Sequence, residues 1–274
     1  MQVQVTLTVT EGKRLIAKGV AALPEVQVAL EKGKILFKGG TTVSAVAEEI
    51  AGVALKISGR ISPRGTRTSG ADIVGKHCLL LNNGTWEYVD DHLKEVVVQL
   101  GPKDVVVIGA NALDAHGGAA MMIGAPLGGA PGEVIAGILS GGAQVVIPVG
   151  LEKLIPGSVY DAIRAAGRTR TEKAMGMAVG LVPLTGRIVT ESIALSLLYD
   201  VRCTVIGKGG IFGAEGATTM IVGGPAAEVE KAFALVQAIK GADAPGLAES
   251  FPECAPGHRT CRNHVGCMYR RKHF

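Results

Sequence analysis

Three cysteines and two histidines are concentrated near the end of the chain, in the segment CAPGHRTCRNHVGC. Thiolate sulfur and imidazole nitrogen atoms are usual zinc ligands, and a structural zinc site holds the ion in a tetrahedron of four of them. Turns at Pro256, Gly257 and Gly266 can bring such ligands together. The sequence therefore predicts a closed structural zinc site, whose candidate ligands are Cys254, His258, Cys261, His264 and Cys267.

The spacing of these residues is also compatible with other kinds of tail. It matches none of the common zinc patterns, such as paired C-x2-C. An iron–sulfur cluster or a redox role is a less favoured alternative, and a tail without bound metal is another. Disulfides account for the tail poorly, because five cysteines cannot all pair and we expect a reducing compartment. Cys78 and Cys203 lie in apolar, strand-like segments and are expected to be buried.

A second candidate site follows an apolar segment at residues 34–38, where the chain reads FKGGTTVSAVAEEI. We expect a buried strand, a turn at Gly39 and Gly40, and a helix that begins at Thr41 and Thr42. Backbone N–H groups at a helix start, together with threonine hydroxyls, can bind phosphate or carboxylate. A threonine that merely caps the helix is the alternative, and the two roles are compatible.

Polar residues also follow another buried strand, which we expect at residues 104–108. Candidate ligand-binding residues in this segment are Asn111, Gly128 and Gly129, and candidate catalytic residues are Asp114 and Glu133. Because the carboxyl ends of parallel strands meet at one edge of a sheet, we expect the two glycine-rich loops to share a crevice. Glu133 is then the best candidate for a base, whereas Asp114 can equally form a turn with Gly117.

A third glycine-rich segment, GKGGIFGAEGATT, lies between two expected strands. Its backbone N–H groups could form an anion-binding nest next to Lys208. The alternative is a long hairpin that covers the edge of a sheet.

Short apolar runs followed by turns and helical patterns indicate parallel strands at 34–38, 104–108 and 144–148. Residues 2–10 alternate polar and apolar side chains, as in a strand, and an amphipathic helix follows them. We therefore predict an α/β fold, in which residues 1–175 form a mostly parallel-sheet domain that binds a ligand.

The pattern changes near residue 176. We expect a strand at 178–184, a helix at 187–199, strands at 201–207 and 217–223, and a helix at 225–239. This βαββα order is most of a ferredoxin-like sandwich and lacks only its last strand. The sequence thus predicts a ferredoxin-like α+β unit over residues 176–245 and a Cys/His-rich tail over residues 246–274.

Composition and charge restrict the classes of function. The formal net charge of the 274-residue chain is +4, and residues 251–274 carry all of it, so the remaining chain is formally neutral. A neutral body argues against a broad nucleic-acid interface. The N-terminus lacks the apolar stretch of a signal peptide, and prolines interrupt the apolar region 115–151. We therefore expect a cytoplasmic protein without a membrane partner.

The glycine-rich patterns resemble a known superfamily. A GTT loop follows the first buried strand, and IGANALDAHGG and MMIGA follow a later one. Over residues 30–150 these patterns resemble ribose-5-phosphate isomerase, the sugar-binding domains of DeoR-type repressors, initiation factor 2B-like isomerases and coenzyme A transferases. The resemblance implies that Gly40, Thr41 and Thr42 hold a phosphate or similar anion and that Glu133 lies where the isomerase has its carboxylate base. An appended ferredoxin-like unit also occurs in ribose-5-phosphate isomerases.

The chain departs from this pattern at Asn111, where the isomerases have aspartate, and in IGAPLGG, where ribose-5-phosphate isomerase has a lysine. An amide does not ionise near neutral pH and cannot replace a carboxylate in proton transfer. We therefore expect a protein that binds a small phosphorylated or carboxylated metabolite, oriented by Asn111 and Asp114, with catalysis undecided. A non-catalytic metabolite sensor or assembly subunit is the alternative, and we expect a homo-oligomer.

Overall fold

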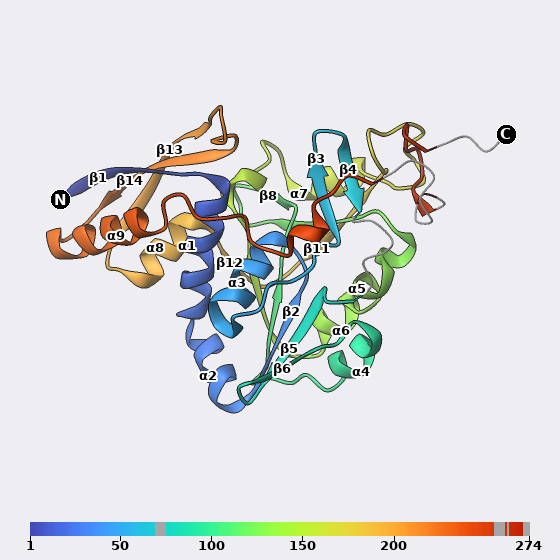
Figure 1. The fold of residues 1–274 in the computed structure, drawn as a ribbon, viewed down its shortest axis with the longest axis horizontal. Coiled ribbons are helices and arrows are strands. Elements are labelled where there is room, and N and C mark those ends of the chain that lie inside the picture. The colour runs from blue at the N-terminus through green and yellow to red at the C-terminus, as the bar shows by residue number, and fades with distance from the viewer. Residues whose placement is uncertain (69–74, 255–260, 262, 271–274) are drawn as a thin grey trace.

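The computed structural model describes residues 1–68, 75–254, 261 and 263–270. In this part of the chain, helices surround a six-stranded sheet with the strand order β12-β10-β7-β2-β5-β6, and smaller antiparallel sheets lie beside it (Figure 1). The predicted α/β class with a largely parallel main sheet is confirmed.

Four neighbouring strands of the main sheet are parallel. They are β2 (Lys34–Lys38), β7 (Val105–Ile108), β10 (Gln144–Pro148) and β12 (Arg187–Val189). Antiparallel β5 (Cys78–Asn82) and β6 (Thr85–Tyr88) extend the sheet beyond β2. Parallel strands are covered on both faces and therefore read as continuous apolar runs. All four residues of β7 are buried, and the three strands expected from such runs are present.

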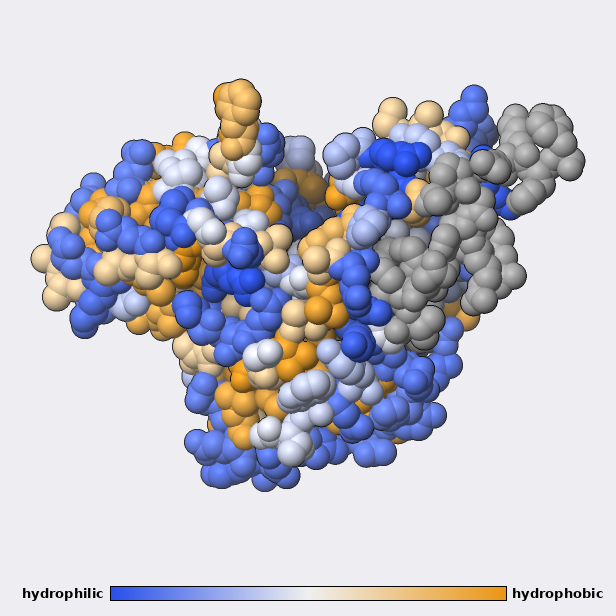
Figure 2. Space-filling model, viewed as in Figure 1, coloured by the Kyte–Doolittle hydropathy of each residue, from blue (hydrophilic) through white to orange (hydrophobic). Residues whose placement is uncertain are grey.

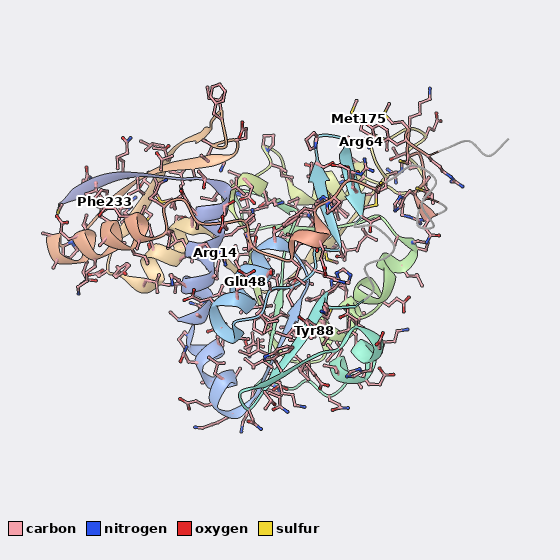
Figure 3. The ribbon with its side chains drawn as sticks, viewed as in Figure 1. Arg14, Glu48, Arg64, Tyr88, Met175 and Phe233 are labelled. Carbon is pink, nitrogen blue, oxygen red and sulfur yellow. The ribbon has the colours of Figure 1, made fainter. Side chains whose placement is uncertain are left out.

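Helices cover both faces of the main sheet. One face packs against α1 (Val9–Ala21), α2 (Pro24–Lys32) and α3 (Thr41–Ala51), and the other against α4 (Leu93–Val97) and α6 (Ile135–Ser140). Within β2, Phe37 belongs to the first core and Leu36 to the second, because successive strand residues point to opposite faces. Arg14 of α1 and Glu48 of α3 form an ion pair with an N–O distance of 2.5 Å (Figure 3).

A separate three-stranded antiparallel sheet, which we call the small sheet, has the order β1-β14-β13. It consists of β1 (Gln2–Leu7), β14 (Ala217–Gly223) and β13 (Arg202–Gly209), and it packs with α8 (Glu191–Leu198) and α9 (Ala226–Ala238). The prediction that residues 178–184 supply the first strand of this unit is wrong. The N-terminal strand β1 takes that position beside β14, with Val5 opposite Met220. Residues 187–189, expected to begin a helix, form β12 instead.

The segment expected to start the second unit pairs elsewhere. β11 (Gly180–Leu184) pairs with β9 (Ala119–Ile123), which also pairs with β8 (Ala112–Leu113). Helix α7 (Val159–Ala165) packs on this β11-β9-β8 sheet, and the short helix α5 (Gly129–Glu133) follows β9. This sheet closes one side of the space beyond the carboxyl ends of β2 and β7.

The polar segment GRISPRGTRTSG contains a hairpin of β3 (Gly59–Ser62) and β4 (Gly65–Thr68). The C-terminal segment returns across the molecule to the residues just before this hairpin, since Leu247 N donates to Leu55 O at 2.9 Å and Ile57 N donates to Ser250 Oγ at 3.0 Å. Among the described residues, no helix combines the length and the apolar character that a membrane crossing requires.

Candidate functional site

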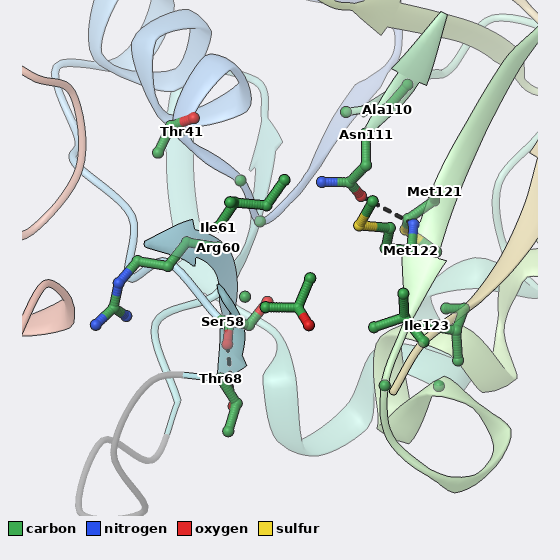
Figure 4. Close-up of a pocket in the computed structure, with 18 of the residues that line it drawn as sticks. Thr41, Ser58, Arg60, Ile61, Thr68, Ala110, Asn111, Met121, Met122 and Ile123 are labelled. Atoms are coloured by element: carbon green, nitrogen blue, oxygen red, sulfur yellow. Dashed lines mark hydrogen bonds between the residues drawn. The ribbon is translucent and has the colours of Figure 1, made fainter. Parts of the chain in front are cut away.

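A cavity of about 640 Å³ lies beyond the carboxyl ends of β2 and β7 (Figure 4). The structure brings seven of the predicted ligand-binding residues to its wall, namely Gly39, Gly40, Thr41, Thr42, Asn111, Gly128 and Gly129. The two glycine-rich loops therefore share one cavity, as the parallel arrangement of the strands requires. Its volume is typical of small-molecule sites.

The first loop presents the N-terminus of α3 to the cavity. Gly40 is the N-cap residue, with φ 145°, and no side chain caps the helix. The proposal that a threonine side chain caps this helix is therefore wrong. Gly39 N donates to His77 O at 2.9 Å, and a Cβ atom at Gly39 would lie 2.8 Å from that oxygen, so the turn requires glycine. N–H groups in a first helical turn have no intrahelical acceptor and favour an anion.

Lys38, the last residue of β2, also lines the cavity and was not predicted as a site residue. It is only 4% exposed, and its Nζ lies 3.5 Å from Met121 Sδ. Burial is the main cause that lowers the pKa of Lys38 to about 8. Burial in turn raises the pKa of Cys78 to about 12, so this residue stays a neutral thiol. Among the residues that the structure describes, no carboxylate forms an ion pair with Lys38.

Asn111 follows β7 and has a fixed amide orientation. Its Oδ1 accepts a hydrogen bond from Met122 N at 2.9 Å, which leaves the Nδ2 group as a donor directed into the cavity (Figure 4). Met121, Met122 and Ile123 add an apolar wall on the same side. Asn111 therefore has the geometry of a residue that orients a ligand oxygen atom.

Asp114 is committed to the turn after β8. Its carboxylate accepts backbone hydrogen bonds from Val159 N at 2.9 Å, Gly118 N at 2.7 Å and His116 N at 2.9 Å. The Val159 and Gly118 amides hold the pKa of Asp114 below its usual value. The residue does not line the cavity. Of the two roles considered for Asp114, this geometry favours the turn.

Glu133 does not reach the cavity wall either. It ends α5 and forms an ion pair with Lys94 of α4, with an N–O distance of 2.6 Å. The predicted base is therefore held by a cation of the neighbouring helix. Its assignment as a catalytic residue stays a prediction that this placement does not favour.

Other polar residues of the cavity wall were also not predicted from the sequence. Lys13 of α1 is buried and lies 3.4 Å from Glu152 Oε1, while His77 Nδ1 lies 3.1 Å from Lys56 O. Burial lowers the pKa of Lys13, and Glu152 opposes the shift. The only sequence signal for Lys38 is a cation at the end of an apolar strand, directly before two glycines.

The C-terminal segment forms part of the cavity wall through Phe251, Asn263 and His264. The Arg60 guanidinium of β3 holds this segment by donating to Ser250 O at 2.8 Å, Phe251 O at 2.8 Å and Pro252 O at 2.6 Å. Further along, Ala174 N donates to Gly266 O at 2.8 Å. Hydrogen bonds to the main body thus position the tail over the cavity.

The predicted zinc site is not decided by this geometry. Within the described part of the tail, no group of three or more metal-binding side chains is arranged around a common point, and His258 lies outside the described residues. Cys254 Sγ accepts a hydrogen bond from the Arg67 guanidinium. Zinc and iron–sulfur binding therefore stay predictions.

The third glycine-rich loop lies outside the cavity wall. It is the tip of the β13–β14 hairpin, where Gly213 N donates to Glu215 Oε2 at 2.9 Å, and Lys208 Nζ donates to Thr218 Oγ1 at 3.0 Å. The predicted alternative, a long hairpin at the edge of a sheet, describes this loop.

The chain has a mixed α/β fold with a cavity at the carboxyl edge of its parallel strands. Comparison with protein-family models, curated proteins and solved structures found no match. The resemblance to sugar-phosphate isomerases and coenzyme A transferases therefore stays a prediction, and the function has to be inferred from the site.

Proposed function

We propose that the protein binds a small phosphorylated or carboxylated metabolite in the cavity beyond β2 and β7. The observation that carries this proposal is Lys38, a buried lysine on the cavity wall whose nearest hydrogen-bond acceptor is the sulfur of Met121. Sulfur is a weak acceptor, so the ammonium form lacks solvation that an anionic oxygen would restore.

The surroundings of Lys38 support an anionic ligand with an organic body. The uncapped start of α3 lies only three residues further along the chain and offers N–H groups to the same cavity. Asn111 adds a directed amide donor, while Met121 and Met122 add apolar surface. A few convergent polar donors within an apolar wall are typical of small-molecule sites.

The proposal is tested by thermal-shift measurements with inorganic phosphate, sugar phosphates, nucleotides and coenzyme A esters. A ligand that binds only the folded state raises its stability by mass action. We expect at least one of these anions to raise the melting temperature of the wild type and to lose at least about tenfold in affinity in Lys38→Met, because a desolvated charge pair is removed.

Lys32→Met is the matched control, because Lys32 is an exposed lysine at the end of α2 and lies outside the cavity wall. This variant is expected to bind as the wild type does. Anion binding that is equally strong in Lys38→Met and the wild type would reject the proposed site.

A second candidate function, a non-catalytic assembly subunit, is favoured by the edge of the small sheet. β13 pairs only with β14 among the described residues, and its hairpin exposes Ile206, Ile211 and Phe212, the last of them 97% exposed. Figure 2 shows the apolar tip of this hairpin projecting from the surface of the molecule. An exposed apolar edge strand is suited to pairing with another chain. Light scattering of the wild type and Ile206→Lys tests whether the edge mediates self-association.

A further inference from the structure

Lys13, Lys38 and Lys56 are buried, and among the described residues only Lys38 of the three has no carboxylate partner. Lys13 lies 3.4 Å from Glu152, and Lys56 lies 3.2 Å from Glu249. Lys38 is at least as deeply buried as either of them. Because burial of an unpaired charge is unfavourable, the neutral amine is more populated at Lys38 than at an ordinary lysine.

The neighbouring strands contribute no charged side chain to Lys38. In the sheet register, Lys38 lies between Cys78 of β5 and Ile108 of β7, and Met121 of β9 reaches its Nζ. Of these neighbours only Cys78 can ionise, and its buried thiol stays neutral near pH 7. The hydrogen bond from Lys38 Nζ to Met121 Sδ uses an N–H group, so it leaves the lone pair of the neutral amine available.

We propose that Lys38 is a catalytic nucleophile that forms an imine with a carbonyl group of the anionic metabolite. This inference rests on the proposed function: the ammonium form of Lys38 binds an anion without a carbonyl group, such as phosphate, whereas with a carbonyl substrate the start of α3 holds the anionic group and Lys38 acts as the amine. The implied substrate class is a small aldehyde or ketone that carries a phosphate or carboxylate group.

The reaction balances without an oxidant or a further reactant. The Lys38 Nζ lone pair attacks the carbonyl carbon, the C–O double bond becomes single, and one amine proton moves to the oxygen. The hydroxyl group of this carbinolamine then leaves with the second amine proton as water, and a C=N bond forms. An amine must be unprotonated to attack, which is the reason that enzymes use desolvated lysines for this step. The apolar wall formed by Met121 and Met122 favours the step that releases water.

Pyridoxal 5′-phosphate is a suitable probe, because it combines an aldehyde with a phosphate group. The whole 274-residue chain is incubated with this probe, the imine is followed by its absorbance, and borohydride then reduces it to a stable secondary amine. We expect peptide mapping to find Lys38 as the main modified residue, at least about tenfold above Lys13 and Lys153, two other lysines of the cavity wall. Excess inorganic phosphate is expected to reduce the modification.

Lys38→Arg keeps the positive charge but cannot form an imine, and Lys38→Met is a second variant in case arginine does not fit. Each variant is first checked for the wild-type circular dichroism spectrum. Both are expected to lose the imine absorbance and the labelled peptide. Labelling confined to other lysines, or equal labelling of the wild type and both variants, would overturn the inference.

The phosphate thermal shift separates the two proposals. If phosphate stabilises the wild type and no imine forms at Lys38, the binding site stands and the nucleophile is wrong. If neither phosphate nor any other tested anion binds, the proposed function fails together with this inference.

Discussion

At the scale of single residues, the chemistry of the cavity depends on which polar groups the fold leaves without an internal partner. Lys13 and Lys38 are both buried, but Glu152 accompanies only the first. Asn111 Oδ1 accepts a hydrogen bond from Met122 N, and the amide hydrogens of Asn111 are directed into the cavity. Lys38 and Asn111 both present donors to the cavity, and these donors are the reason that an anion is the expected ligand.

Asn111→Asp is expected to weaken phosphate binding at least about tenfold. The new carboxylate can still accept the hydrogen bond from Met122 N, but it repels an anion that lies in the cavity. At about 4 Å such a repulsion is worth about 1 to 4 kcal/mol. The measurement is a phosphate titration followed by thermal shift.

Asn82→Asp provides the matched control, because it adds the same charge at the opposite end of β2, where Asn82 lies opposite Lys34 in the sheet. Phosphate binding that is unchanged in Asn111→Asp would show that the anion does not occupy the space in front of Asn111.

At the scale of elements, the start of α8 carries a buried carboxylate. Glu191 accepts a hydrogen bond from Leu151 N at 2.9 Å, and it faces Lys13 of α1, Glu152 after β10 and Lys208 of β13. Burial is the main cause that raises the pKa of Glu191 to about 7. This junction joins the small sheet to the main sheet, and its stability therefore depends on pH.

Glu191→Gln is expected to remove part of that dependence. Between its ordinary pKa of 4.5 and the folded value of about 7, the folded state keeps a proton that the unfolded state has released. The free energy of unfolding therefore falls as pH rises through this window, by up to about 3 kcal/mol. At pH 8 the variant, which cannot ionise, should be more stable than the wild type. Denaturant unfolding at pH 5 and pH 8 measures the difference.

Glu230→Gln serves as the control, since Glu230 lies on an exposed face of α9. If wild type and Glu191→Gln lose the same free energy of unfolding between pH 5 and pH 8, the raised pKa of Glu191 is wrong.

At the scale of the whole molecule, the first described segment of the chain completes the small sheet, and the last completes the cavity wall. β1 supplies an edge strand of the small sheet, and the segment after residue 246 supplies part of the cavity wall (Figure 1). Arg60 and Arg67 of the β3–β4 hairpin hold this second segment through its carbonyl groups and Glu253. Cavity shape is therefore coupled to the attachment of the tail.

Arg60→Met is expected to loosen the tail while the main fold stays intact. The variant removes three guanidinium hydrogen bonds to the carbonyls of residues 250–252. Loss of such bonds costs about 1.5 kcal/mol or more, so limited proteolysis of the C-terminal segment should become at least about tenfold faster. Mass spectrometry of the remaining fragment measures the rate, and Arg202→Met, at an exposed position of β13, is the control.

The same assay tests the predicted zinc. If a bound metal anchors the tail, a chelator accelerates proteolysis of the wild type, and elemental analysis finds zinc before treatment. If Arg60→Met releases the tail and chelation does not, the arginine contacts are sufficient. A rate of proteolysis that is unchanged in Arg60→Met would contradict the anchoring role of Arg60.

The sequence by itself determined the elements whose pattern is local. The buried strand 34–38, the turn at Gly39 and Gly40 and the shared cavity at the edge of the sheet follow from hydrophobic periodicity, glycine positions and parallel topology. The loops that line the site could be predicted for the same reason.

Only the tertiary structure decided how these elements combine. Both β1 and β11 had a strand pattern, and long-range pairing placed β1 beside β14 and β11 beside β9. Likewise, Asp114 and Glu133 carry suitable carboxylates, but backbone amides and Lys94 engage them. Lys38 became the central residue because no carboxylate in the described structure pairs with it. Desolvation and charge pairing depend on contacts between segments far apart in the chain, which periodicity does not encode.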